Sequence, residues 1–204
     1  MKRKLLLINI AFLWFLVVGG GELILLNYDN TPGLSVKAPS EWPSESRINR
    51  SHAQPTLIMF VHPECPCSRA SAGELELLMA RLQGKIATKV LFYKPASVPQ
   101  QRKETNLLNQ IRNIPGVELI EDLNGVEARR FNIFTSGATI LYDAEGHLRF
   151  NGGITPWRSH SGDNIGRSAI VSIVSDPSLK AHQTETFVFG CPIFPQQKQG
   201  GNLS

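Results

Sequence analysis

The first strong pattern along the chain is a long apolar run near its N-terminus. Residues 5–21 carry no charge, and beyond Glu22 the apolar residues continue to Leu26. A helix needs about 20 apolar residues to span a bilayer, whereas the apolar part of a cleaved signal peptide is roughly 7 to 15 residues long. The length therefore predicts a retained transmembrane anchor over residues 1–26, with cleavage after the glycines at 19–21 as the alternative.

The segment that follows the anchor has neither a helical nor a strand pattern. Residues 27–54 are rich in proline, serine and asparagine, and the prolines interrupt any regular helix. We interpret this segment as a linker that lifts a folded domain off the bilayer, with a short strand near Leu34 to Lys37.

Beyond the linker, short apolar runs of strand length alternate with segments of helical periodicity. The predicted strands are Thr56–His62, Thr88–Tyr93, Val117–Ile120, Ala138–Tyr142 and His147–Phe150, and the predicted helices are Ser68–Leu82, Gln101–Ile111, Val126–Phe131 and Asn164–Val174. The turn-forming residues 143–146 between the last two strands predict a hairpin. This order predicts an α/β sandwich with a mixed, mostly parallel central sheet and flanking helices over residues 55–180, followed by a tail at 181–204.

Charge changes the picture only at the N-terminus. The formal net charge is +4, but residues 2–4 are all basic and precede the apolar run, while from Ser51 onward 15 Lys plus Arg stand against 13 Asp plus Glu. Basic residues stay on the cytoplasmic side, which predicts a single-pass protein of the inner (plasma) membrane with its domain on the periplasmic or extracytoplasmic side. No basic stripe with interleaved aromatic residues is present, so we expect no nucleic-acid partner.

The three cysteines are the candidate chemistry. A disulfide scaffold would have more cysteines in a shorter chain, and here two of the three, Cys65 and Cys67, are separated by one residue where a predicted strand turns into a helix. A helix N-terminus favours the thiolate, which is the form that attacks disulfides. The third thiol, Cys191, lies far along the chain, but a C-terminal strand that folds back would bring it to the same place.

The residues around these cysteines resemble the thioredoxin-like superfamily. The segment 60–68, Phe-Val-His-Pro-Glu-Cys-Pro-Cys-Ser, stands where that superfamily has aromatic-Cys-x-x-Cys, and residues 137–143 resemble its hairpin entry. Further segments are similar to a family of anchored bacterial thioredoxin-like proteins labelled RedB: residues 65–71, 135–137, 152–155, 158–164 and 188–191. The resemblance implies a thioredoxin-like fold and thiol-disulfide exchange.

The chain differs from the thioredoxin-like pattern at two functional positions, the resolving cysteine and the cis-proline. Counting back seven residues from Leu75 places Ser68 at the usual resolving position, so that Cys67 occupies an inner position of the motif. Gly137 stands where the superfamily has a cis-proline facing the disulfide.

We therefore hypothesise an extracytoplasmic thiol-disulfide oxidoreductase that reacts with a protein thiol or disulfide partner through a mixed disulfide and needs no cofactor. Cys65 is the expected nucleophile, Cys67 its resolving partner through a tight and strained ring, and Cys191 a third thiol. The alternatives are a module or metallochaperone for copper or another soft metal built on the same three cysteines, peroxide reduction, and a purely structural role for buried cysteines.

The loop at residues 152–164 is rich in polar groups. Its functional interpretation is that it lines the thiol site, with Arg158 and His160 lowering a thiol pKa or holding an anionic group of the substrate. Gly137, outside this loop, is a further expected substrate-binding residue. The structural interpretation of the loop is that the glycines serve turns, Asp163 caps the following helix and Arg158 is solvated.

Overall fold

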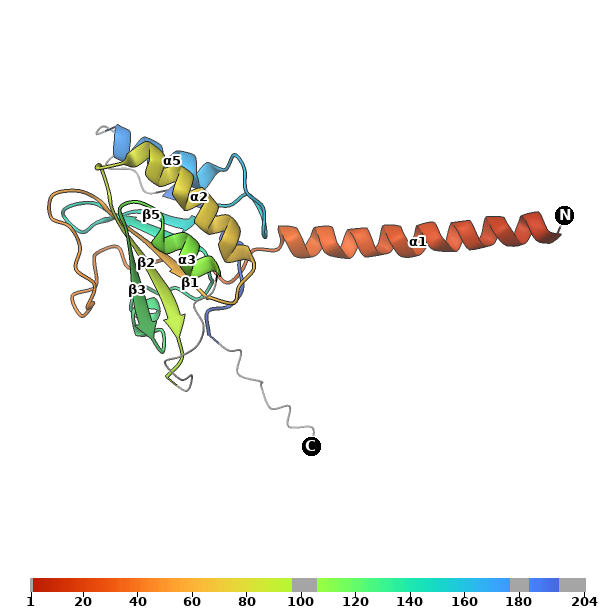
Figure 1. The fold of residues 1–204 in the computed structure, drawn as a ribbon, viewed down its shortest axis with the longest axis horizontal. Coiled ribbons are helices and arrows are strands. Elements are labelled where there is room, and N and C mark those ends of the chain that lie inside the picture. The colour runs from red at the N-terminus through yellow and green to blue at the C-terminus, as the bar shows by residue number, and fades with distance from the viewer. Residues whose placement is uncertain (1, 97–105, 177–183, 195–204) are drawn as a thin grey trace.

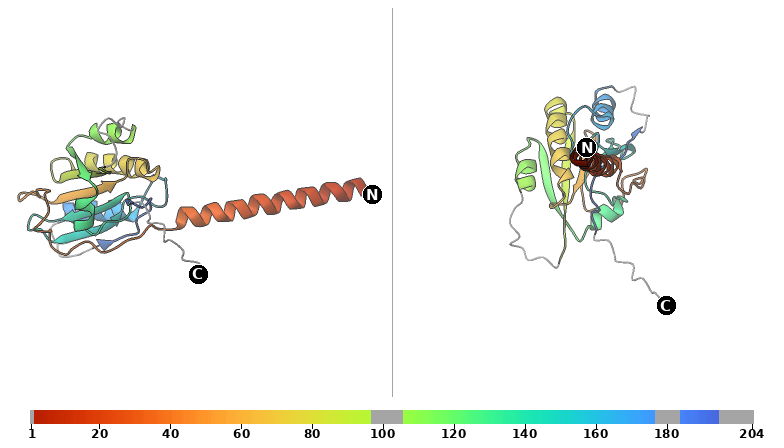
Figure 2. Two further views of the ribbon diagram at one scale, coloured as in Figure 1. Left: turned by 90° about the horizontal axis from the view of Figure 1, so that it is seen from below. Right: turned by 90° about the vertical axis from the view of Figure 1, so that its right-hand side faces the viewer.

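The computed structural model describes residues 2–96, 106–176 and 184–194. Its first element is the straight helix α1 (Lys2–Asn30), which extends away from the rest of the protein as a single rod (Figure 1, Figure 2). None of its residues is buried, and its length and composition suffice to cross a membrane. The predicted apolar helix is therefore present, and it continues four residues beyond the predicted anchor.

The folded domain is built on one six-stranded sheet. Its strands are β1 (Thr56–Val61), β2 (Ala87–Lys94), β3 (Val117–Leu123), β4 (Ala138–Tyr142), β5 (Leu148–Gly153) and β6 (Thr184–Glu185). They lie in the order β3-β2-β1-β4-β5-β6. The ladders β1–β2, β2–β3 and β5–β6 are parallel, whereas β4 is antiparallel to both of its neighbours. The predicted mixed, mostly parallel sheet with its hairpin is confirmed.

Helices cover one face of this sheet (Figure 2). They are α2 (Cys67–Leu82), α3 (Asn106–Arg112) and α5 (Ile165–Ser175). Successive side chains of a strand point to opposite faces, so β1 sends Leu57 and Met59 toward these helices and Ile58 and Phe60 to the other face. A strand that is apolar at every position, as β1 is, suits this place between two cores.

The second face of the sheet is covered by α4 (Val126–Arg130) and by part of the segment interpreted as a linker. Ala38 and Ile48 are buried there, and the Trp42 ring packs edge-on against two aromatic rings of this core. The strand expected at Leu34 to Lys37 does not form. Residues 38–48 of the segment therefore belong to the core, because their apolar side chains close a face that no long helix covers.

Several details of the elements differ from the sequence prediction, and β3 continues three residues beyond the predicted Ile120. β5 continues to Gly153, two glycines of the supposed loop being paired with β4, and the two-residue β6 was not predicted. The helix α5 is capped by Asn164, whose side chain accepts a hydrogen bond from the Arg167 N–H, and not by Asp163. Residues 101–105 of the predicted third helix lie outside the described residues, and α3 covers the remainder.

Candidate functional site

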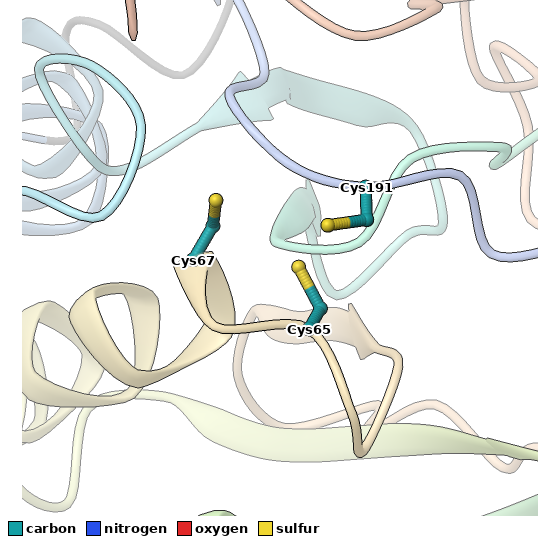
Figure 3. A group of neighbouring side chains, drawn as sticks. All are labelled: Cys65, Cys67 and Cys191. Carbon is teal, nitrogen blue, oxygen red and sulfur yellow. The ribbon is translucent and has the colours of Figure 1, made fainter.

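The three cysteines come together at one end of the sheet. Cys65 lies in the turn after β1, Cys67 is the first residue of α2, and Cys191 lies on the C-terminal segment that passes over that turn (Figure 3). The three sulfur atoms all lie within 4.8 Å of one another, and all three thiols are free. Cys65 and Cys67 are almost completely buried, and Cys191 is partly exposed.

Backbone hydrogen bonds hold the C-terminal segment in this position. The Ser136 N–H donates to the Cys191 carbonyl, and the Ile193 N–H donates to the Phe134 carbonyl, each over 2.8 Å. A bridge between Thr135 and Pro192 makes the pairing antiparallel. The segment thus pairs with residues 134–136 through an isolated antiparallel bridge, which places the Cys191 side chain over Cys65.

Gly190 permits this close approach. A Cβ atom there would collide with the Ser136 carbonyl oxygen, which is a rigid backbone atom. Forcing an extra methyl group into packed structure costs about 1 to 3 kcal/mol, so Gly190→Ala should slow closure of a Cys65–Cys191 bond about tenfold or more. Timed alkylation with mass spectrometry measures this rate. Gly73→Ala, where the nearest atom to the added Cβ is 3.8 Å away, is the control and should leave the rate unchanged.

The environment of Cys65 favours its thiolate. Burial opposes ionisation, but hydrogen bonds from the side chain and backbone of Cys191 and of Ser68 outweigh it, so the pKa of Cys65 lies below the ordinary thiol value. Cys191 behaves in the opposite way. Burial, its hydrogen bond to Cys65 and the charges of the other two cysteines raise its pKa to about 12, against a smaller lowering by Arg158.

A pH profile of alkylation tests this asymmetry. Because a lowered pKa keeps the thiolate populated at lower pH, Cys65 should reach half of its maximal alkylation rate below pH 9.0, the unperturbed value. Cys191→Ala removes one donor to the thiolate and should move the midpoint of Cys65 upward. A midpoint at or above pH 9.0 in the unmodified chain, with no shift in the variant, would contradict this electrostatic account.

Three serines belong to the site, and only Ser68 was marked out by the sequence. The Ser68 and Ser136 hydroxyls are 2.7 Å apart, and Ser136 also accepts the His62 N–H over 2.7 Å. Ser159 donates to the Cys67 sulfur over 3.3 Å. Each cysteine of the motif therefore has a hydroxyl beside it. The resemblance of residues 135–137 was the one sequence signal near Ser136, and only the folded loop brings Ser159 to the thiol.

Arg158 connects the site to α1, and it is buried, so the interpretation of a solvated side chain is wrong. Its Nη1 donates to the Gly190 carbonyl over 2.8 Å, its Nε donates to the Thr31 carbonyl over 3.1 Å, and its backbone N–H donates to the Asp29 carbonyl over 3.2 Å. Its charge lowers the pKa of Cys191, while substrate binding by Arg158 and His160 stays a prediction. His160 is exposed, and its Nδ1 lies 2.6 Å from the Arg158 carbonyl oxygen.

Comparison with known proteins gives structural neighbours only. No family model and no curated protein matches the chain. A hypothetical protein from Sinorhizobium meliloti aligns over 80% of this chain and 97% of its own, with a TM-score of 0.59 and 17% identity. An uncharacterized conserved protein from Geobacillus kaustophilus aligns over 83% and 96%, with a TM-score of 0.55 and 15% identity. A secreted Mycobacterium tuberculosis disulfide oxidoreductase aligns over 61% and 82%, with a TM-score of 0.42 and 15% identity.

The fold is thioredoxin-like. Its four central strands lie in the order β2-β1-β4-β5, in which β1 and β2 are parallel and β4 is antiparallel to β1. The turn that contains Cys65 follows the carboxyl end of β1.

Gly137 differs in its backbone conformation, as well as in its side chain, from the cis-proline that the sequence resemblance implies at this position. Gly137 has a φ of +88°, and no peptide bond of the described residues is cis. Its N–H donates to the Phe60 carbonyl over 2.7 Å, and an added Cβ would lie 2.8 Å from the Ser71 hydroxyl. Glycine is needed here for both the backbone conformation and the space. A substrate-binding role for Gly137 stays a prediction.

A buried ion pair fixes the loop that carries Arg158 and Ser159. Glu74, fully buried on α2, pairs with Arg167 of α5 and accepts hydrogen bonds from the Gly162 N–H and the Asn164 side chain. These contacts tie the C-terminal end of the loop that precedes α5 to the helix that begins with Cys67. Glu74 thus positions the loop and has no contact with a sulfur atom in the described structure.

Proposed function

We propose that the protein is a thiol-disulfide oxidoreductase that exchanges disulfides with a partner protein. The observation that carries the proposal is the convergence of three thiols within 4.8 Å, one of which has a lowered pKa and another a raised pKa. Such opposed values are what a nucleophile and a resolving thiol need, because the first must be ionised at rest and the second must not compete with it.

The exchange balances with two thiols and one partner disulfide. The Cys65 thiolate attacks one sulfur of the partner disulfide, which forms a mixed disulfide and releases the other partner sulfur as a thiolate. A second thiol of the chain then loses its proton and attacks the Cys65 sulfur, which releases the remaining partner sulfur. The partner gains two electrons and becomes a dithiol, and the chain gives up two electrons and forms an internal disulfide. Each step is reversible.

Cys191 is the better placed second thiol, in place of the Cys67 expected from the sequence. It hydrogen-bonds to the Cys65 sulfur, whereas Cys67 contacts the Ser159 hydroxyl. Two causes of its raised pKa, the hydrogen bond to Cys65 and the charge of Cys65, end when Cys65 enters a mixed disulfide. Cys191 therefore becomes easier to ionise at the moment when it is needed.

Partner entry requires the C-terminal segment to move. Cys65 is 3% exposed, and the segment bearing Cys191 lies over it. Two backbone hydrogen bonds and the Arg158 contact to Gly190 hold that segment. A partner strand that displaces the segment would gain access to Cys65, and the return of the segment would bring Cys191 back for the second step.

Mass spectrometry of variants in which one cysteine is replaced by serine tests which thiol resolves the mixed disulfide. The full chain, reduced and kept in detergent, is mixed with a peptide disulfide and quenched with acid. Cys191→Ser should accumulate a mixed disulfide on Cys65, because nothing resolves it, while Cys67→Ser should pass through to an internal Cys65–Cys191 bond. Accumulation in Cys67→Ser and none in Cys191→Ser would assign the second step to Cys67.

We further propose that the domain lies on the extracytoplasmic side of the inner membrane. The support is the long apolar helix α1 together with the basic residues at 2–4 that precede it. The same features and the cysteine segments support membership of the RedB-like group of anchored thioredoxin-like proteins. Exchange with a protein partner there fits an oxidising compartment, where disulfides persist.

The same cluster supports a second candidate, delivery of Cu(I). Three thiolates around one ion with metal–sulfur bonds of about 2.3 Å would hold their sulfurs roughly 4 Å apart, close to the spacing that the cluster already has. Cys65, Cys67 and Cys191 would bind the ion as cargo. The raised pKa of Cys191 disfavours this use, because a ligand thiol must lose its proton.

A further inference from the structure

The end of α1 is fixed to the thiol site, so the domain does not hang from a free tether. Arg158 holds the carbonyls of Asp29 and Thr31, and its guanidinium group lies 4.8 Å from the centre of the Tyr28 ring. The same guanidinium group donates to Gly190, the residue before Cys191. Figure 1 shows the start of α2 at the end of the domain where α1 meets it.

The apolar run of α1 ends close to these contacts. Its last apolar residue is Leu26, and the Asp29 carbonyl lies one turn or less further along the helix, at about 4.5 Å for a rise of 1.5 Å per residue. The headgroup layer on each side of a bilayer is roughly 5 to 8 Å thick. With α1 across the membrane, Arg158 and the C-terminal segment beside it meet the headgroup layer.

Two exposed aromatic side chains lie at this level. Tyr28 is on the last turns of α1, and Trp157 directly precedes Arg158 in the loop. They are 56% and 43% exposed. Tyrosine and tryptophan are enriched where membrane proteins cross the headgroup layer, because their rings are apolar and carry one polar group. Two such rings at the level of the headgroups suit a lipid surface.

We propose that the thiol end of the domain is a membrane-binding surface that rests on the headgroup layer through Tyr28 and Trp157. The partner surface is the bilayer itself. Taken with the proposed function, on which this consequence rests, the cysteines then exchange with thiols or disulfides that a partner presents at the bilayer surface, and proteins free in the aqueous compartment reach them poorly.

Tryptophan fluorescence of the full chain in nanodiscs tests the surface. In the double variant Trp14→Phe with Trp42→Phe, Trp157 is the remaining tryptophan. We expect lipids brominated near the headgroup to quench it several-fold more than lipids brominated near the chain ends, and aqueous iodide to quench it weakly. Strong iodide quenching with no effect of brominated lipid would overturn the proposal.

The matched control keeps Trp42 instead, in Trp14→Phe with Trp157→Phe. The Trp42 backbone N–H donates to the Gly146 carbonyl at the hairpin turn, over 2.8 Å. This turn lies beyond the N-terminal end of β1, one strand length of about 20 Å from the cysteine turn. It should not respond to brominated lipid. Because fluorescence does not depend on the thiols, a chain without exchange activity still gives this result if it binds the surface, and the two proposals fail separately.

Discussion

Replacing Cys65 with serine is expected to abolish disulfide exchange with a model peptide disulfide. A serine hydroxyl is not ionised at neutral pH and cannot form a disulfide, so the rate should fall to that of the uncatalysed reaction, a loss on the order of 10³-fold or more. A stopped assay that separates oxidised from reduced peptide by chromatography measures it.

The matched variant is Cys67→Ser, which makes the same sulfur-to-oxygen change on the other side of Pro66. If Cys191 resolves the mixed disulfide, this variant keeps most of the activity. Exchange that survives in Cys65→Ser at more than a few per cent of the original rate would remove Cys65 from the role of nucleophile.

Replacing Glu74 with alanine is expected to give the largest loss of stability. The variant leaves the buried Arg167 guanidinium with a single ion-pair partner, the fully exposed carboxylate of Asp163. Breaking a buried ion pair from one side costs about 3 to 5 kcal/mol. The Gly162 N–H and the Asn164 side chain lose an acceptor at the same time. Urea unfolding of the full chain in detergent, followed by far-ultraviolet circular dichroism, measures the midpoint.

Glu76→Ala is the control, because Glu76 lies on the same helix and is exposed. A surface substitution of this kind changes stability by about 0.5 kcal/mol or less. Equal midpoints for the two variants would show that the ion pair does not hold the loop at 152–164 in place.

Periodicity sufficed for the parts of the fold that local pattern determines. The strand at Ala138–Tyr142 was predicted to the residue, and the helix after the cysteines to within one residue, because apolar runs and helical spacing are local signals. The core formed by residues 38–48 was missed, since proline-rich sequence without periodicity is typical of linkers. The two-residue β6 is too short to leave a pattern.

The reactive residues were predictable where they are neighbours in the sequence. The spacing of Cys65, Cys67 and Ser68 at a strand-to-helix turn was visible in the sequence, whereas the position of Cys191 over Cys65 depends on pairing between segments far apart in the chain. The helix cap at Asn164 in place of Asp163 shows the limit of local reasoning. Both residues are good caps, and the turn at Gly162 and the buried Glu74 decide between them.

Alkylation and mass spectrometry of the mildly oxidised full chain, with a parallel Cu(I) titration, test the central claim most directly. We expect one reducible bond between Cys65 and Cys191, one free thiol at Cys67, and weak Cu(I) binding. Three thiols that stay reduced in air and together bind one Cu(I) ion tightly would contradict the oxidoreductase and favour the copper-binding role.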